Sequence, residues 1–119
     1  MADYVDGFCF PIAREHLEAY QALSTSVAAI WREHGAIDYR EFVGDDLHLE
    51  GTRSFIDAVD ADDDEVVVFG WVTFASREAR DAAGAKVAAD TRVAELMANA
   101  DTGFDARRMV YGGFGAFVS

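Results

Sequence analysis

The sequence predicts one α+β domain with the element order strand, helix, strand, strand, helix, strand. Two observations lead to this order. Four segments alternate or concentrate apolar residues as strands do, and two other segments repeat them at helical steps of three and four. The order is that of a ferredoxin-like βαββαβ fold, a four-stranded antiparallel sheet with two helices on one face. With 119 residues, the chain suits a single domain over residues 1–119.

The first strand and the first helix come from the N-terminal third of the chain. Side chains alternate over residues 4–10, and Pro11 is expected to end that strand. Apolar and polar side chains then separate onto different sides of a helix over about residues 13–34. Gly35 stands where a left-handed C-terminal cap belongs.

The second strand and a short helix are predicted next. Residues 36–43 alternate again, and "GDD" follows them as a turn signal. The segment from 44 to 64 is too long to lack structure inside a compact domain. Its "RSFIDAV" stretch predicts a short helix that buries Phe55, Ile56 and Val59.

The C-terminal half supplies the third strand, the second helix and the fourth strand. "EVVVFGWVTF" is apolar at nearly every position, which predicts a central strand covered on both faces. Ser76 is the expected N-cap of the second helix, which "TRVAELMANA" extends or restarts with Val93, Leu96 and Met97 on its apolar side. "RRMVYGGFGAFVS" predicts the fourth strand.

The fourth strand carries three glycines among its aromatic residues, and two explanations stay open. Gly112 and Gly113 could form a bulge that curls the strand, which we favour because bulges are common at sheet edges. Alternatively, Gly113 and Gly115 lie on one face and leave a void under a neighbouring aromatic ring. Such a void between two sheets would be a pocket.

Composition excludes several classes of partner. A net charge of -12 disfavours nucleic acid and acidic membranes, because both are anionic. No apolar run approaches the roughly 20 residues of a membrane span, and the N-terminus lacks the basic region of a signal peptide. Cys9 is the only cysteine, which agrees with a reducing compartment. We therefore expect a cytoplasmic protein.

The third and fourth strands present Phe, Trp and Val on both of their faces. Because both predicted helices lie on one face of the sheet, the other face needs a second layer. We expect this layer to be another copy of the chain, so that the sheets of a homodimer pack face to face.

Several stretches together resemble the DUF1428 family, also called the YbaA-like proteins. They are "YVDGF", "WREHGAIDY", "VGDD", "VVVFGW", "SREARD" and "FDARRMVYGGF". The resemblance covers most of the chain and implies the dimeric α+β barrel fold. It implies no catalytic residue, because this superfamily fold hosts monooxygenases, haem-degrading enzymes, isomerases and stress-response proteins.

Two residues are candidates for proton transfer. Asp6 lies among aromatic residues of the first strand. In an apolar cavity its carboxylate could act as a general base. We favour the alternative, an ion pair with Arg107 or Arg108 that gives Asp6 a structural role. His34 ends the first helix, where it either complements the helix dipole or moves a proton to a ligand near Trp31.

The candidate ligand-binding residues are Trp31, Trp71, Arg108, Tyr111 and Gly113. Trp71 and Tyr111 could form an aromatic wall, although such rings are more often core residues.

No cofactor or metal site is expected. The three histidines share no metal-ligand spacing and no cysteine cluster accompanies them.

Three functions stay open at this point. The first is a homodimer that binds a small hydrophobic or aromatic ligand in a cavity beside the sheet. The alternative is a cofactor-independent monooxygenase or isomerase of the antibiotic-biosynthesis-monooxygenase type, in which Asp6 or His34 moves a proton while Trp71 and Tyr111 hold a planar substrate. The third is a purely structural or interaction protein.

Overall fold

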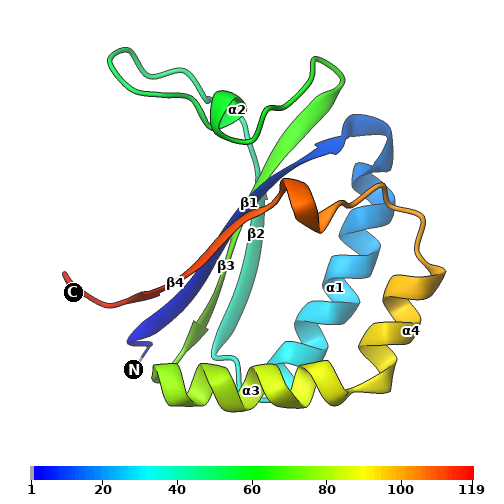
Figure 1. Cartoon of the computed structure of the whole chain (residues 1–119), viewed down its shortest axis with the longest axis vertical. Coiled ribbons are helices and arrows are strands. Elements are labelled where there is room, and N and C mark those ends of the chain that lie inside the picture. Colours follow the sequence, from blue (N-terminus) through cyan, green and yellow to red (C-terminus); the bar gives the residue numbers. More distant parts are fainter. Residues whose placement is uncertain (1) are drawn as a thin grey trace.

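The computed structural model describes residues 2–119 and confirms the predicted element order (Figure 1). Its strands and α-helices are β1 (Tyr4–Ala13), α1 (Leu17–Glu33), β2 (Asp38–Val43), α2 (Phe55–Ala58), β3 (Glu65–Phe74), α3 (Arg77–Ala89), α4 (Thr91–Asn99) and β4 (Val110–Gly115). Short 3-10 helices precede α1 and β4, at Arg14–His16 and Ala106–Arg108.

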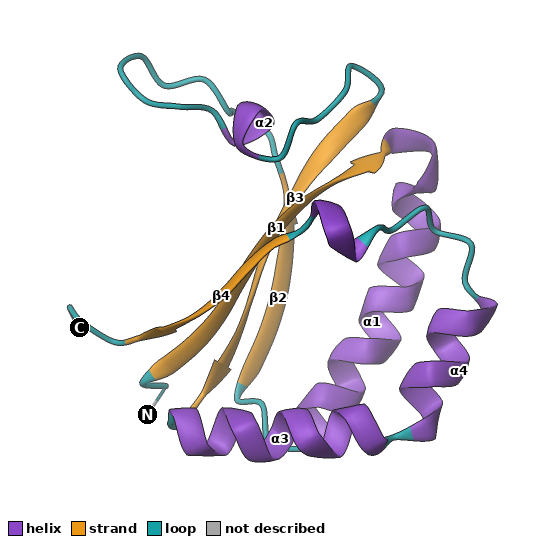
Figure 2. Ribbon diagram, in the orientation of Figure 1, coloured by secondary structure: helices purple, strands orange, loops and turns teal. Residues whose placement is uncertain are grey.

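The strands form one antiparallel sheet in the order β2-β3-β1-β4, so β3 is central as predicted. Helices α1, α3 and α4 lie on one side of this sheet (Figure 2). Within residues 2–119, no helix has both the length and the apolar character that crossing a membrane requires.

The first strand is longer than predicted, because Pro11 lies inside β1 rather than at its end. The backbone explains this. Pro11 pairs with Val67, whose carbonyl oxygen accepts from the Gly44 amide on the opposite side. The proline nitrogen therefore points away from β3, toward the side where β4 pairing has already stopped at Cys9. A missing N–H there removes no ladder hydrogen bond.

Local signals set the helix boundaries. Gly35 has a φ of +123°, as expected after the C-cap of α1. The Ser76 side chain accepts from the Ala79 amide, which confirms it as the N-cap of α3. Asp90 ends α3, and its side chain accepts from the Arg92 amide at the start of α4. The second predicted helix therefore restarts at Asp90.

The main core lies between the sheet and α1, α3 and α4. Alternate positions of β1 and β3 supply most of it, because a strand sends every second side chain to the same face. Its buried members are Phe8, Phe10, Ile12, Ala36, Val68, Val72, Phe74 and Ala83.

On the opposite face, α2 and its loops cover only part of the sheet. Val59 is buried there against Cys9 and Val67, with Ile56 packed beside them. Phe55 was expected to be buried as well, but it remains 47% exposed. Its ring packs against Phe69, with ring centroids 5.9 Å apart, but Phe69 is itself 40% exposed, so this contact leaves much of the Phe55 ring in solvent.

The rest of that face is open in the single chain. Phe42, Phe69, Val110 and Phe114 are all large apolar side chains that remain exposed. The chain's own elements therefore do not cover the third strand on both faces at Phe69, where a second copy is expected to supply the cover. We call this surface the open face.

Both explanations of the β4 glycines need correction. The β1–β4 register runs without interruption from Tyr4–Gly115 to Cys9–Val110, so there is no bulge. A Cβ at Gly113 would overlap the hydroxyl group of Tyr4. The space beside Gly113 is therefore filled by a tyrosine side chain and is not a void.

Gly70 makes a similar close approach, which yields the first prediction. A Cβ at this position would lie 2.5 Å from Cζ of Phe8 and 2.9 Å from Cγ of Glu41. We expect Gly70→Ala to lower the free energy of unfolding by about 1–3 kcal/mol through overpacking. The measurement is urea denaturation followed by circular dichroism.

Gly84 in α3 is the matched control, because nothing lies within 4 Å of a Cβ added there. Gly84→Ala should raise the free energy of unfolding by about 0.5–1 kcal/mol. Equal effects of the two substitutions would show that the contact with Phe8 does not constrain Gly70.

Candidate functional site

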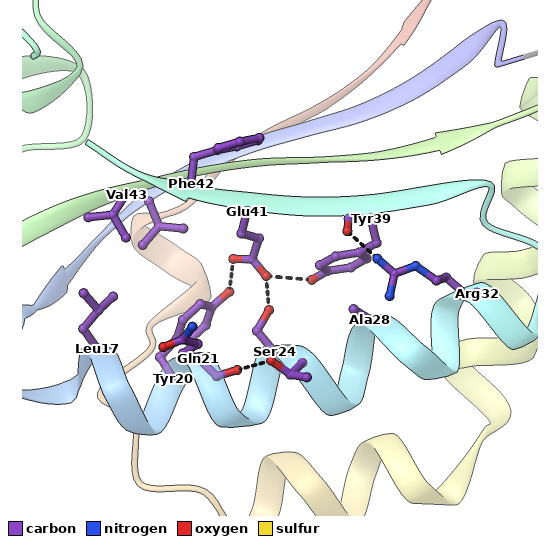
Figure 3. A pocket seen from close by; sticks show the side chains of 12 residues that line it. Leu17, Tyr20, Gln21, Ser24, Ala28, Arg32, Tyr39, Glu41, Phe42 and Val43 are labelled. Carbon is purple, nitrogen blue, oxygen red and sulfur yellow. Dashed lines mark hydrogen bonds between the residues drawn. The ribbon is translucent and has the colours of Figure 1, made fainter. Parts of the chain in front are cut away.

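Two cavities lie between the sheet and the helices, and both are lined by Tyr20, Ser24 and Tyr39. The inner cavity has a volume of about 200 Å³. Its lining is Asp6, Phe8, Phe10, Tyr20, Leu23, Ser24, Val27, Trp31, Tyr39, Val72, Met97, Phe104, Met109 and Tyr111. The outer cavity, between α1 and β2, has a volume of about 360 Å³ (Figure 3).

Aromatic rings dominate the inner cavity. The rings of Phe10 and Phe104 meet edge to face with centroids 4.9 Å apart, and Phe10 and Tyr20 do so at 5.2 Å. Edge-to-face pairs add to the stabilisation that burial of the rings provides. Rigid apolar walls of this kind are typical of sites for small apolar molecules.

Asp6 is the charged residue of the inner cavity, and it is 2% exposed. The predicted ion pair exists, but its partner is Arg80 of α3, whose Nη1 donates to Oδ1 of Asp6 at 3.0 Å. Nη2 of Arg80 donates to the Tyr4 hydroxyl at 2.9 Å. Burial, together with the Asp6 carboxylate, raises the pKa of Tyr111 to about 12. This polar cluster is therefore a paired structural element.

Neither of the arginines expected to pair with Asp6 reaches it. Arg107 binds Asp105, two residues before it, at 3.0 Å. Arg108 donates to both carboxylate oxygens of Glu65 at 2.6 and 2.9 Å, and its hydrogen bond lowers the pKa of Glu65. Arg108 thus joins the approach to β4 to the start of β3, and it lines neither cavity.

His34 lies outside both cavities as well. Its Nε2 is 2.8 Å from Oδ2 of Asp90, the residue between α3 and α4. Hydrogen bonds from Arg92 and then from His34 lower the pKa of Asp90. This contact between His34 and Asp90 connects the C-terminal end of α1 with the junction between α3 and α4.

The predicted aromatic residues divide between the two faces of the sheet. Trp31 and Tyr111 line the inner cavity. Trp71 packs on the other face against Phe42, with ring centroids 5.0 Å apart, and against Phe69 at 6.0 Å. A wall formed by Trp71 and Tyr111 together is therefore wrong. Trp71 pairs with Gly7 of β1, whereas Tyr111 pairs with Phe8, the next residue of the same strand. Because neighbouring residues of a strand face opposite ways, the two rings lie on opposite faces of the sheet.

The prediction from sequence missed a second carboxylate, Glu41 of β2. Glu41 Oε1 accepts from the Tyr20 hydroxyl at 2.5 Å, and Oε2 accepts from the hydroxyls of Tyr39 at 3.0 Å and of Ser24 (Figure 3). Burial and the Glu41 charge raise the pKa of both tyrosines. The sequence feature that could have revealed Glu41 is the alternation of β2, because it puts Glu41 on the same face as Tyr39 and Val43.

Comparisons with known proteins agree on the family and the fold. A family model described as "Protein of unknown function (DUF1428)" matches residues 3–106. The "Uncharacterized protein YbaA" of Escherichia coli K12 is 35% identical over 115 residues, which cover 97% of each chain, and YbaA of Shigella flexneri gives the same values.

Among solved structures, Rv0793 from Mycobacterium tuberculosis superposes with a TM-score of 0.54 at 14% identity. The match covers 98% of this chain and 97% of Rv0793. At this identity the likeness shows the fold.

A double-mutant cycle tests the structural role of Asp6. Asp6→Ala leaves the mostly buried Arg80 without its carboxylate, so we expect the free energy of unfolding to fall by about 3–5 kcal/mol. Arg80→Met on that background should restore part of the loss, with a coupling energy above about 1 kcal/mol in urea denaturation.

The exposed Asp105–Arg107 pair serves as the control cycle, because Arg107 is 91% exposed. Its coupling energy should stay below about 1 kcal/mol. Additive effects of the Asp6 and Arg80 substitutions would contradict the structural role of the buried pair.

Proposed function

The chain belongs to the DUF1428 family, and we propose that it functions as a homodimer that binds a small hydrophobic or aromatic ligand in the inner cavity. The observation that carries this proposal is the aromatic lining of a cavity of about 200 Å³. An apolar cavity of about 150 Å³ suffices for a benzene-sized molecule. A small aromatic molecule, from one substituted ring up to two fused rings such as indole, therefore matches the available volume.

The chemistry of the lining favours a neutral ligand. Asp6 is neutralised by Arg80, and the other lining residues carry no charge at neutral pH. Trp31, Tyr20 and Phe104 offer ring faces and edges, and Met97 and Met109 adapt to irregular shapes. A charged molecule would lose its hydration here without gaining a free counter-ion.

The enzymatic alternative, a cofactor-independent monooxygenase or isomerase, has less support from the geometry. Asp6 is engaged by Arg80, and His34 contacts Asp90 outside the cavities. Trp71 lies across the sheet from Tyr111, so these two rings do not hold one substrate between them. Binding without turnover requires none of these groups to be free.

The homodimer is supported by the open face. Phe69, Phe114 and Val110 are 40%, 60% and 55% exposed. They pair with Cys9 or Val5 of β1, which puts them on the sheet face opposite to α1, α3 and α4. A contiguous apolar sheet surface of this kind is typical of an interface. A second copy can cover it with the same surface about a two-fold axis.

Ligand binding is tested by filling the inner cavity. Val27→Phe adds bulk to a lining residue of α1, and we expect it to weaken the binding of indole at least about tenfold, because the ring occupies the ligand's space. The measurement is isothermal titration calorimetry, with native mass spectrometry of the freshly purified parent to detect a retained ligand.

Ala29→Phe is the control, since it places a phenyl ring on an exposed position of the same helix. It should leave indole affinity unchanged. Indole affinity that is equal in the parent and in Val27→Phe would overturn the inner cavity as the binding site.

The dimer is tested by light scattering at micromolar concentration. The parent should have the mass of two chains, and Phe69→Arg should shift it to one, because a charge on the open face cannot be buried against a second apolar sheet. Val43→Arg changes a residue that is 46% exposed and pairs with Val68 on the helix-covered face of the sheet, so this variant should remain dimeric. A monomeric parent would sink the proposed assembly.

A further inference from the structure

The outer cavity differs from the inner one in its charge. Leu17, Ala28, Val43 and Val68 give it apolar walls, and the carboxylate of Glu41 points from β2 toward α1 within it (Figure 3). Its volume of about 360 Å³ exceeds that of the inner cavity. It therefore combines apolar surface with one acidic group.

The hydrogen-bond partners of the Glu41 carboxylate are all neutral groups. The hydroxyls of Tyr20, Ser24 and Tyr39 donate to its two oxygens. Among the ion pairs of residues 2–119, none includes Glu41. This contrasts with Asp6, which is neutralised by Arg80 at 3.0 Å.

Arg32 is the cationic residue that lines the outer cavity, and it interacts with Tyr39 and Asp38 and not with Glu41. Its Nη2 donates to the carbonyl oxygen of Tyr39 at 2.8 Å and lies 3.9 Å from Oδ1 of Asp38. Its charge is thus shared with Asp38 at the rim. A carboxylate has about four acceptor sites, so three hydroxyl donors leave room at Glu41 for a further donor.

We propose that the outer cavity binds an organic cation, a protonated amine with a short apolar tail, and that Glu41 is its counter-ion. The ammonium group donates to Glu41 in a charge-assisted hydrogen bond, and the tail lies along Leu17, Val43 and Val68. The rings of Tyr20 and Tyr39 add favourable cation–π surface. The net charge of -12 attracts cations toward the protein over longer distances.

This site is separate from the proposed function, because a neutral ligand of the inner cavity requires no contact with Glu41. Failure of indole binding would overturn the inner-cavity proposal and leave the cation site standing. Failure of the amine experiment below would overturn the cation site and leave the inner-cavity proposal standing.

The test compares three probes of equal tail length, namely hexylammonium, hexanol and hexanoate. Isothermal titration calorimetry at pH 7 and low ionic strength should show hexylammonium binding about tenfold or more tightly than hexanol, with hexanoate the weakest. Amide NMR shifts caused by hexylammonium should centre on Ser24, Thr25 and Ala28. Equal or tighter binding of hexanoate, or no binding of hexylammonium at millimolar concentration, would overturn the proposal.

Glu41→Gln removes the charge but keeps an amide oxygen that accepts hydrogen bonds from the surrounding hydroxyls. We expect the affinities for hexylammonium and hexanol to come within about twofold of each other in this variant. Glu18→Gln, on an exposed position of α1, changes the net charge by the same amount and should retain the full preference. A preference that survives Glu41→Gln, or that is lost equally in Glu18→Gln, would rule out Glu41 as the counter-ion.

A second variant covers the case in which Glu41→Gln does not fold. Thr25 is exposed and lines the outer cavity, so Thr25→Trp blocks the site from its rim without changing the partly buried Glu41 carboxylate. Hexylammonium binding should be lost in this variant. Undiminished binding would show that the amine occupies another place.

Discussion

The pairing of β1 with β3 determines where every side chain of the sheet points. The two strands pair in one continuous antiparallel register from Tyr4–Phe74 to Ala13–Glu65. A slip by one residue would move Asp6, Phe8 and Phe10 from the helix-covered face to the other. The core, both cavities and the open face therefore depend on this register.

The domain accommodates two carboxylates on the helix-covered face in different ways. Asp6 is paired with a cation, Arg80, so the inner cavity is close to electrically neutral. Glu41 is surrounded by hydroxyl groups, which satisfy its oxygens but leave its charge in place. Because a charge that is paired with an opposite charge produces a weaker field around it than an unpaired one, the two adjoining cavities differ in their electrostatic environment.

The two faces of the sheet are covered unequally. Three helices protect one face, whereas the other receives only α2 and the loops around it. Val59 and Val67 are buried under this short helix, but Phe69 and Phe114 remain exposed beyond its reach. An uncovered row of aromatic side chains costs solvation free energy, which association of two sheets would recover.

The sequence by itself determined the element order, the antiparallel sheet, the C-terminal end of α1 at Gly35 and the start of α3 at Ser76, because these depend on periodicity and on caps that act within a few residues. It did not determine the start of α1, which begins at Leu17 after a 3-10 helix and not near residue 13. It also indicated that Asp6 would be paired. Only the tertiary structure identified Arg80, 74 residues away, as the partner. The same is true of the hydroxyls around Glu41 and of the face on which Trp71 lies. These contacts depend on strand register and helix placement, which bring distant side chains together and leave no mark in the local pattern.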